Sequence, residues 1–249
     1  MTQHMHRSSS LWDTPSASEE VPGVLTCRHR FISVPEGGLD PQIAVYIANT
    51  GLEGLLWVPS INLDHALITT LVERWRPETH SFHLPDGEMT ITLQDMEVII
   101  GVPVDGLSAV GFTHMQDWGD LCTELLGHRP PNKEVSASKN IAVMERPRVK
   151  VRWLEERFSN PLPANTTEVL VQQYAWCYIL EMLGGMLFMD KSSEQLSIMY
   201  LQFFNPINNI KNYNWGSAAQ SWLYRHLCKA SEKTAKQIGG VMLLVQLWA

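Results

Sequence analysis

The sequence predicts a mainly α-helical protein, built as a single multi-helix domain with one small antiparallel β-hairpin near residues 79–93. Three observations support this fold class. Apolar residues recur with the spacing of a helical face in most of the apolar segments. Residues that favour helix starts and helix stops bracket these segments. One segment instead alternates apolar and polar residues on both sides of a Pro-Asp-Gly turn, as the strands of a hairpin do.

The beginning of the chain differs in composition from the rest. Residues 1–24 are rich in Ser, Pro, Thr and Glu, which predicts a disordered N-terminal tail before a domain that covers residues 25–249. The first helix is expected after Asp40, which would cap it, with Pro41 in its first turn and Gly51 as its stop.

The second helix has the clearest pattern in the chain. In NLDHALITTLVERW the apolar residues form one continuous stripe, and Pro77 prevents the helix from running further. The stripe consists of Leu67, Ile68, Leu71, Val72 and Trp75.

The hairpin prediction rests on separating one apolar face from one polar face. The pairs expected on the apolar face are Leu84 with Met89, Phe82 with Ile91, and His80 with Leu93. Those expected on the polar face are His83 with Thr90, and Ser81 with Thr92. This register requires a four-residue loop from Pro85 to Glu88. Thr92 and Asp95 would then cap a short helix that ends at Gly101.

The second half of the chain continues with helices separated by polar and turn-rich segments. We expect helices over Trp118–Leu126, over Val151–Phe158, from Thr166 or Thr167 through a long apolar segment, and over residues 215–231. Ser192 and Gln195 form a capping-box pattern for a further helix that carries Leu196, Met199, Tyr200 and Phe203. An Asn-rich loop over residues 205–214 follows it. The chain stops in mid-pattern on GGVMLLVQLWA, which predicts a domain truncated at its C-terminus.

Composition and cysteine usage narrow the class of protein. The formal net charge is −7. Proteins that bind nucleic acid through its phosphates usually carry a basic excess. If this chain binds nucleic acid, it would therefore have to do so through a local basic patch. The four cysteines are far apart, which predicts reduced core thiols of an intracellular protein and neither a zinc ribbon nor a disulfide framework. The N-terminus has no apolar signal segment. Residues 169–189 are apolar but interrupted by polar residues and a Gly-Gly pair, so they predict a buried helix and no membrane span.

Catalytic constellations are weak in this sequence. His80 and His83 could bind a metal together with Asp64, His65 or Asp95, but the predicted hairpin places the two imidazoles on opposite faces. The chain has no Gly-x-Ser-x-Gly elbow, no local cysteine-protease signature and no phosphate-binding glycine loop. We therefore assign no catalytic, metal-binding or cofactor-binding residue.

Two stretches are candidates for an interaction surface. One lies at the junction of the second helix and the hairpin, and the other is the basic run RPRVKVR. Their residues are Arg74, Arg76, Glu78 and His83 at the junction, and Arg146, Arg148, Lys150 and Arg152 in the run. The run alternates charged and apolar residues and could contact phosphate or an acidic partner. The alternatives are ion pairs within the junction and a solvated rim at the run.

Several long blocks of the sequence resemble the plant mobile domain family, the family of the MAINTENANCE OF MERISTEMS proteins. The blocks are LDHALITTLVERW, RPETHSFHLPDGEMTITLQDMEVIIGVPVDG, DWGDLCTELLGHRPP, YILEMLGGMLFMDKS and YNWGSAAQSWLYRHLCKAS. The resemblance as a whole covers roughly residues 31–249. They are most similar to family members labelled serine/threonine-protein phosphatase 7 long form homologs, in which the domain accompanies a phosphatase domain.

The resemblance implies a non-catalytic nuclear module that binds a nuclear protein, with a phosphatase-like protein as one candidate partner. Its relatives are tied to meristem maintenance, genome stability and transposon silencing, and the domain also occurs within mobile elements. The phosphatase label does not transfer by sequence, because the motifs GDxHG, GDxxDRG and GNHE that supply the metal ligands do not occur here. A phosphatase-associated protein or cryptic hydrolase, and a nucleic-acid-binding module, are the alternatives.

Overall fold

The described part of the chain is mainly α-helical, as the sequence predicts. The computed structural model describes residues 5–8, 23–28, 30, 32, 38–112, 117–131, 147–158, 160–191 and 194–249. Within these residues, short β-sheets of two or three strands accompany the helices.

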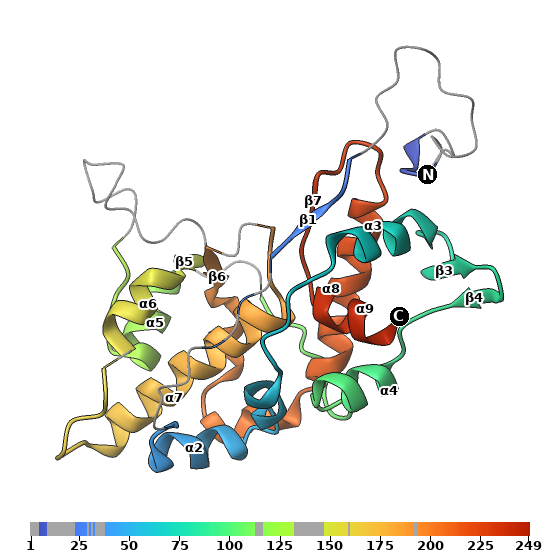
Figure 1. The fold of residues 1–249 in the computed structure, drawn as a ribbon. Coiled ribbons are helices and arrows are strands. Elements are labelled where there is room, and N and C mark those ends of the chain that lie inside the picture. The colour runs from blue at the N-terminus through green and yellow to red at the C-terminus, as the bar shows by residue number, and fades with distance from the viewer. Residues whose placement is uncertain are drawn as a thin grey trace.

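Helices account for most of the ordered elements in these ranges (Figure 1). The α-helices are α2 (Pro41–Ala48), α3 (His65–Arg74), α4 (Leu93–Asp95), α5 (Trp118–Leu126), α6 (Val151–Phe158), α7 (Glu168–Met182), α8 (Trp215–Ala230) and α9 (Met242–Trp248). The 3-10 helices are η2 (Glu53–Trp57), η5 (Ile198–Phe203) and η6 (Ile207–Asn212), and the π-helical turns are η3 (Met96–Ile100) and η4 (Leu183–Leu187). The strands are β1 (Thr26–Cys27), β2 (Trp75–Arg76), β3 (Ser81–Leu84), β4 (Gly87–Met89), β5 (Arg148–Lys150), β6 (Gln195–Ser197) and β7 (Gln237–Ile238).

Helix α7 is the central element of one half of the molecule (Figure 1). Its N-terminus is capped by Thr167, whose side chain accepts a hydrogen bond from the Leu170 N–H. Helices α2, α5 and α6 pack against α7, and apolar side chains are buried on most of its sides. The π-helical turn η4 extends it at Gly184, where an added Cβ would lie 2.7 Å from the Leu196 side chain. Among the described helices, α7 and its neighbours included, none is both long and apolar enough to cross a membrane.

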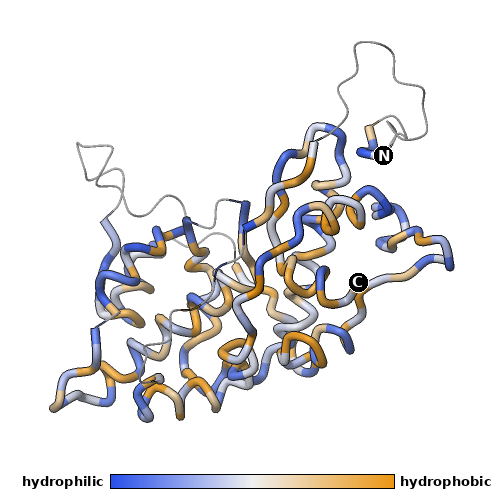
Figure 2. The backbone as a smooth tube through the Cα atoms, viewed as in Figure 1, coloured by the Kyte–Doolittle hydropathy of each residue, from blue (hydrophilic) through white to orange (hydrophobic). Residues whose placement is uncertain are grey.

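Helix α8 is the central element of the other half. Asn214 caps it by accepting a hydrogen bond from the Ser217 N–H at 2.7 Å. Strands β2 and β7 and helix α4 contact α8, while α9 packs against α3. Trp75 and Trp215 are fully buried on this side, and one continuous hydrophobic cluster joins the two halves. Figure 2 shows the same pattern, with hydrophobic segments inside and hydrophilic ones in the outer loops.

The β-hairpin is present, but its register differs from the prediction by two residues. Strand β3 pairs with β4 so that Phe82 faces Met89, His83 faces Glu88 and Leu84 faces Gly87. The loop therefore consists of Pro85 and Asp86, in place of the four residues expected. Gly87 has φ 132°, a conformation that favours glycine and lets the chain re-enter the sheet directly after the turn. Strand β2 adds a third strand, which the sequence analysis had placed at the end of the preceding helix.

The helix predicted from the Ser192 and Gln195 pattern begins later than expected, at Ile198, and is a 3-10 helix that carries Met199, Tyr200 and Phe203. Gln195 begins strand β6 instead of closing a capping box, and it pairs with Lys150 of β5. Val149, between two charged residues of β5, is fully buried, because an alternating run places every second side chain on the same face of a strand. The 3-10 helix η5 follows from Ile198, and the Asn-rich segment expected as a loop contains η6. Ser192 lies outside the described residues.

Residues 5–8, which belong to the segment predicted as an N-terminal tail, pack against the domain. The buried members are His6, Arg7 and Ser8. Arg7 Nη1 donates a hydrogen bond to the Ala235 carbonyl at 2.7 Å, and Arg7 Nε lies 3.8 Å from Glu73 Oε1. Most of the remaining predicted tail lies outside the described residues, so the domain boundary at residue 25 stays a prediction.

The four cysteines are free thiols. Cys27, Cys122 and Cys177 are buried, and Cys228 is partly buried. Burial raises the pKa of the Cys27 thiol to about 11 and that of Cys122 to about 12. Thiols with such pKa values stay protonated at neutral pH and serve as packing residues.

Candidate functional site

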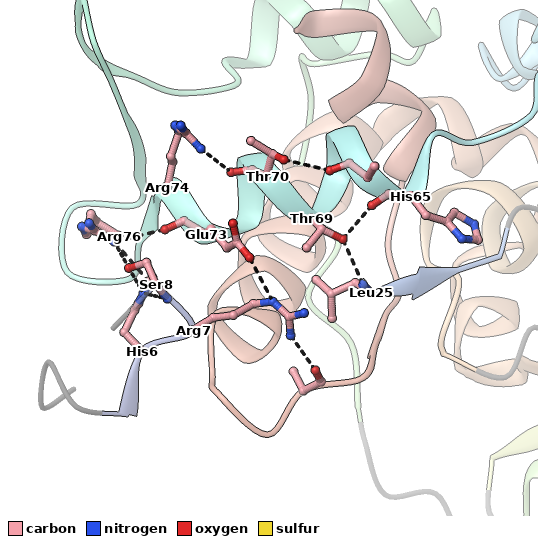
Figure 3. Close-up of polar contacts among 12 residues, drawn as sticks. His6, Arg7, Ser8, Leu25, His65, Thr69, Thr70, Glu73, Arg74 and Arg76 are labelled. Carbon is pink, nitrogen blue, oxygen red and sulfur yellow. Dashed lines mark hydrogen bonds and ion pairs between the residues drawn. The ribbon is translucent and has the colours of Figure 1, made fainter. Parts of the chain in front are cut away.

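The first predicted interaction surface, which we call the junction surface (Arg74, Arg76, Glu78 and His83), is partly covered by the chain's own N-terminal residues. Figure 3 shows residues 6–8 beside α3. Arg76 Nη1 lies 3.4 Å from His6 Nε2 and 3.5 Å from Ser8 Oγ. Arg74 Nη1 donates to the carbonyl of Thr70, one turn back in its own helix. These two arginines therefore make contacts that stabilise the fold.

One of the two exposed members of the junction surface is paired within the hairpin. Glu78 and His83 are both exposed. His83 Nε2 lies 3.1 Å from Glu88 Oε1, and the Ser81 hydroxyl donates to Glu88 Oε2 at 2.8 Å. The cross-strand pairing of His83 with Glu88 is a consequence of the observed register, which the sequence analysis did not predict.

The two hairpin imidazoles do not converge on a common point. The ring of His80 stacks on Tyr224 with 5.6 Å between ring centroids, whereas His83 contacts Glu88. Across the described ranges, no group of three or more His, Cys, Asp or Glu side chains is placed to hold a metal ion.

The basic run is divided between two elements. Arg148 in β5 donates from Nη1 to Asp190 Oδ2 at 2.6 Å. Arg152 belongs to α6 and pairs with Glu156 one turn later at 2.8 Å. Lys150 is exposed, and Arg146 lies outside the described residues. Arg148 and its neighbour Pro147 line a cavity of the structure.

That cavity belongs to a groove between α8 and the segments that contain β6 and η5. Two adjoining cavities of about 340 and about 580 Å³ form it. They share the residues Phe188, Tyr200, Trp222 and Arg225, so they are continuous. A more open hollow extends the larger cavity and shares Lys191 and Lys229 with it. We call this continuous depression the α8 groove.

The floor of the α8 groove is aromatic. The rings of Phe188 and Tyr200 stack with 4.6 Å between centroids. Trp222 meets Phe188 edge-on at 6.3 Å, and its indole Nε1 donates to the Met189 carbonyl at 3.3 Å. These mutual contacts fix the rings in one arrangement, which gives the groove a preformed floor.

The rim of the groove carries an excess of positive charge. Arg225 lies where the two cavities meet, Lys191 and Lys229 lie where the larger cavity meets the hollow, and Lys236 lines the hollow. Within the described part of the chain, Arg225, Lys191 and Lys229 form no ion pair.

Two acids lie along the same rim. Asp190 is held by Arg148, so its charge is already compensated, and Glu232 lies in the open hollow next to Lys229 and Lys236. The positive charge therefore exceeds the negative charge along the groove, although the whole chain is acidic.

His226 is a buried histidine in the wall of the groove. It is 6% exposed, and its Nδ1 has no hydrogen-bond partner among the described atoms. Burial, and then the charges of Lys229, Lys191 and Arg225, lower the pKa of His226 to about 4, against an opposing effect of Asp190. His226 is thus a neutral imidazole at physiological pH. An added Cβ at Gly239 would lie 3.0 Å from His226 Cε1, so glycine lets the loop before α9 close over the ring.

Part of this site was visible in the sequence. Trp222, Arg225, His226 and Lys229 have the spacing i, i+3, i+4 and i+7, which places them along one side of α8. The sequence analysis predicted a helix over residues 215–231 and singled out none of these four residues as a site. The contributions of Lys191 and Arg148 depend on long-range packing, which no local pattern reveals.

The fold and this groove define a mainly helical domain with a cationic, aromatic-floored groove. Comparison with known proteins then gives the family: the chain belongs to the plant mobile domain family, whose sequence model matches residues 51–249. No solved structure matches the fold.

Curated relatives from Arabidopsis thaliana match nearly the whole chain. Serine/threonine-protein phosphatase 7 long form homolog is 42% identical over 99% of this chain, which corresponds to 17% of the relative. Protein MAINTENANCE OF MERISTEMS is 34% identical over 91% of this chain and 45% of the relative, and Protein MAIN-LIKE 2 is 32% identical over 99% and 35%. The chain therefore spans less than half the length of these relatives.

Proposed function

We propose that this chain is a non-catalytic protein-interaction module of a plant nuclear protein. The observation that carries the proposal is the α8 groove, which combines a rigid aromatic floor with Lys191, Arg225 and Lys229, cations that form no ion pair with the residues the structure describes. Preformed grooves of this kind hold a ligand by shape and complementary charge. The ionisable groups that line it are mainly cations and a neutral histidine, which suit binding better than acid–base catalysis.

The proposed biological setting follows the relatives' names and the family resemblance. The relatives include Protein MAINTENANCE OF MERISTEMS, and the family resemblance adds genome stability and transposon silencing. We place this chain in the same nuclear processes. Because it corresponds to a part of those proteins, the module is proposed to supply one binding step to them.

The name of the phosphatase homolog suggests a partner for this module more readily than an activity of it. This chain corresponds to 17% of that relative. The acid nearest the groove floor, Asp190, is already held by Arg148. A phosphatase-like protein is therefore proposed as a candidate partner.

Nucleic-acid binding is the second candidate function, because the cations along α8 are the kind of feature that neutralises phosphates. A salt titration distinguishes the two functions. Phosphate binding predicts an affinity for a DNA duplex or a single strand that falls steeply and linearly with the logarithm of salt concentration.

The proposed function is tested by proximity labelling and pull-down from plant nuclei with the whole chain as bait. We expect specific nuclear proteins to be recovered, and no phosphoester hydrolysis by the purified chain. Steady phosphatase turnover that is lost on chelation, or recovery of nucleic acid alone, would contradict the proposal. A bait with Arg225→Glu and Lys229→Glu shows whether the groove carries the interaction.

A further inference from the structure

We propose that the α8 groove binds an acidic peptide segment of the partner protein, with one apolar side chain of that segment seated at the groove end near Val110. This inference rests on the protein-interaction function proposed above and adds the chemistry of the partner. It follows from the different character of the two ends of the groove.

The smaller cavity is the end of the groove that no described lysine lines. Its lining combines hydroxyl side chains with apolar ones, which include Ala109, Val110, Ala218 and the rings of Trp215 and Trp222. Val110 is 81% exposed, so the edge of this cavity presents apolar surface to water. An apolar side chain of a ligand would remove this surface from water.

The loop that carries Val110 is held in place from both sides. Gln202 in η5 accepts a hydrogen bond from the Phe112 N–H at 2.7 Å and donates to the Met199 carbonyl at 2.7 Å. At the other side, the Leu107 N–H donates to the Asn212 carbonyl at 2.7 Å. The end near Val110 is therefore anchored by the described contacts and does not need to form on binding.

The opposite end is cationic, and its charges lie in a row. Arg225 and Lys229 are one turn apart on α8, a rise of about 6 Å along the helix axis. Lys191 and Lys229 both border the hollow, in which Lys236 follows. A row of separate cations fits successive carboxylates of an extended chain, whereas a single phosphate would require the cations to converge.

The arrangement of the aromatic rings favours a peptide over a nucleic acid. Bases are bound by stacking on free aromatic faces. Here Tyr200 and Phe188 stack on each other, and Trp222 is tilted against the His226 ring at 4.8 Å with its indole N–H already bonded.

The test measures binding of a fluorescein-labelled synthetic peptide to the whole chain by fluorescence anisotropy. The peptide carries one leucine followed by a run of glutamates. Two matched peptides replace the leucine by glycine, or the glutamates by glutamines. We expect both replacements to weaken binding by about tenfold or more, because each removes the group that one end of the groove recognises.

Matched protein variants locate the site. Arg225→Glu with Lys229→Glu should weaken binding of the original peptide by at least about tenfold. Lys150→Glu with Lys211→Glu makes the same change in net charge at exposed lysines outside the groove, and should change the affinity by less than about twofold. All four residues are exposed, so the variants are expected to fold, which a thermal melt confirms.

The outcomes separate this inference from the proposed function. Three results would overturn the acidic-peptide inference. The first is an equal loss of binding in both variants, and the second is an equal affinity for the glutamine peptide. The third is tighter binding of a single-stranded oligonucleotide that is abolished by Arg225→Glu with Lys229→Glu. Nuclear proteins recovered equally by the wild-type and groove-variant baits would overturn it as well, while leaving the interaction function intact. Failure to recover any protein partner would overturn the proposed function itself.

Discussion

The junction surface and the α8 groove both carry several charged residues, yet they differ in what those charges contact. At the junction, Arg76 faces the chain's own His6 and Ser8, and His83 faces Glu88. In the groove, Arg225 and Lys229 have no ion-pair partner among the described residues. A cluster of charges therefore indicates a binding surface only where the fold leaves those charges unsatisfied.

The largest effect on stability is expected at Trp75, next to the junction surface, and Trp222 of the α8 groove is the matching tryptophan for comparison. Trp75 is fully buried, donates from Nε1 to Cys228 Sγ at 3.3 Å, and contacts the Phe82 ring at 4.8 Å. Trp75→Ala should lower the free energy of unfolding by about 3–5 kcal/mol. Trp222→Ala, at a partly exposed ring, should cost less than half as much but abolish peptide binding. Urea denaturation measures both losses, and equal losses would contradict the contrast between the two regions.

The buried imidazole of the groove predicts an acid-sensitive fold. Because the pKa of His226 falls from 6.5 to about 4 in the folded chain, the unfolded chain binds more protons between these two values. The contribution of His226 to stability should therefore decrease by up to about 3 kcal/mol as the pH falls from 6.5 to 4. Denaturation midpoints at a series of pH values measure the slope. His226→Gln should remove this contribution, so that the variant loses less stability on acidification than the wild type, and an unchanged slope in the variant would refute this cause.

The buried Glu181 in α7 has the opposite effect on the pH dependence of stability. Its contribution must therefore be measured separately from that of His226. Burial raises the pKa of Glu181 to about 7, with Arg30 opposing the shift and Glu155 adding to it. The folded chain then binds more protons than the unfolded chain between pH 4.5 and 7, so this group costs stability as the pH rises. Glu181→Gln should stabilise the chain at pH 8 by up to about 3 kcal/mol and leave it nearly unchanged at pH 4. A stabilisation that is equal at both pH values would contradict this account.

The smallest effect is expected at the exposed pair of the junction surface. His83 and Glu88 are about half exposed, at 42% and 52%. Such a pair contributes little, so His83→Ala should change the free energy of unfolding by less than about 0.5 kcal/mol. It should also leave peptide binding at the wild-type level. A clear loss of peptide affinity in this variant would return the junction surface to consideration as the interface.

The helices were predictable because their signals are local. Asp40 before Pro41, Thr92 with Asp95, and Gly127 after α5 each fix a helix end through neighbouring residues, and the structure places those ends where the sequence predicts them. The mainly helical class follows from the same signals.

The strand pairings and the groove were not predictable in the same way. The hairpin has alternative registers that all separate apolar from polar residues, and the turn at Pro85 and Asp86 decides between them. Strands β5 and β6 come from segments almost fifty residues apart, which no local pattern connects. The groove combines Arg148, Lys191 and α8, so it exists only after tertiary packing.

Carbodiimide cross-linking of the chain to the acidic peptide, read by mass spectrometry, tests the central claim most directly. This reagent joins a carboxylate to a lysine amine in direct contact with it. The account predicts cross-links at Lys229 and Lys191, and few at Lys233, whose backbone N–H bonds the Met5 carbonyl on the junction side. Cross-links concentrated at Lys233 or Lys211, with none along α8, would contradict it.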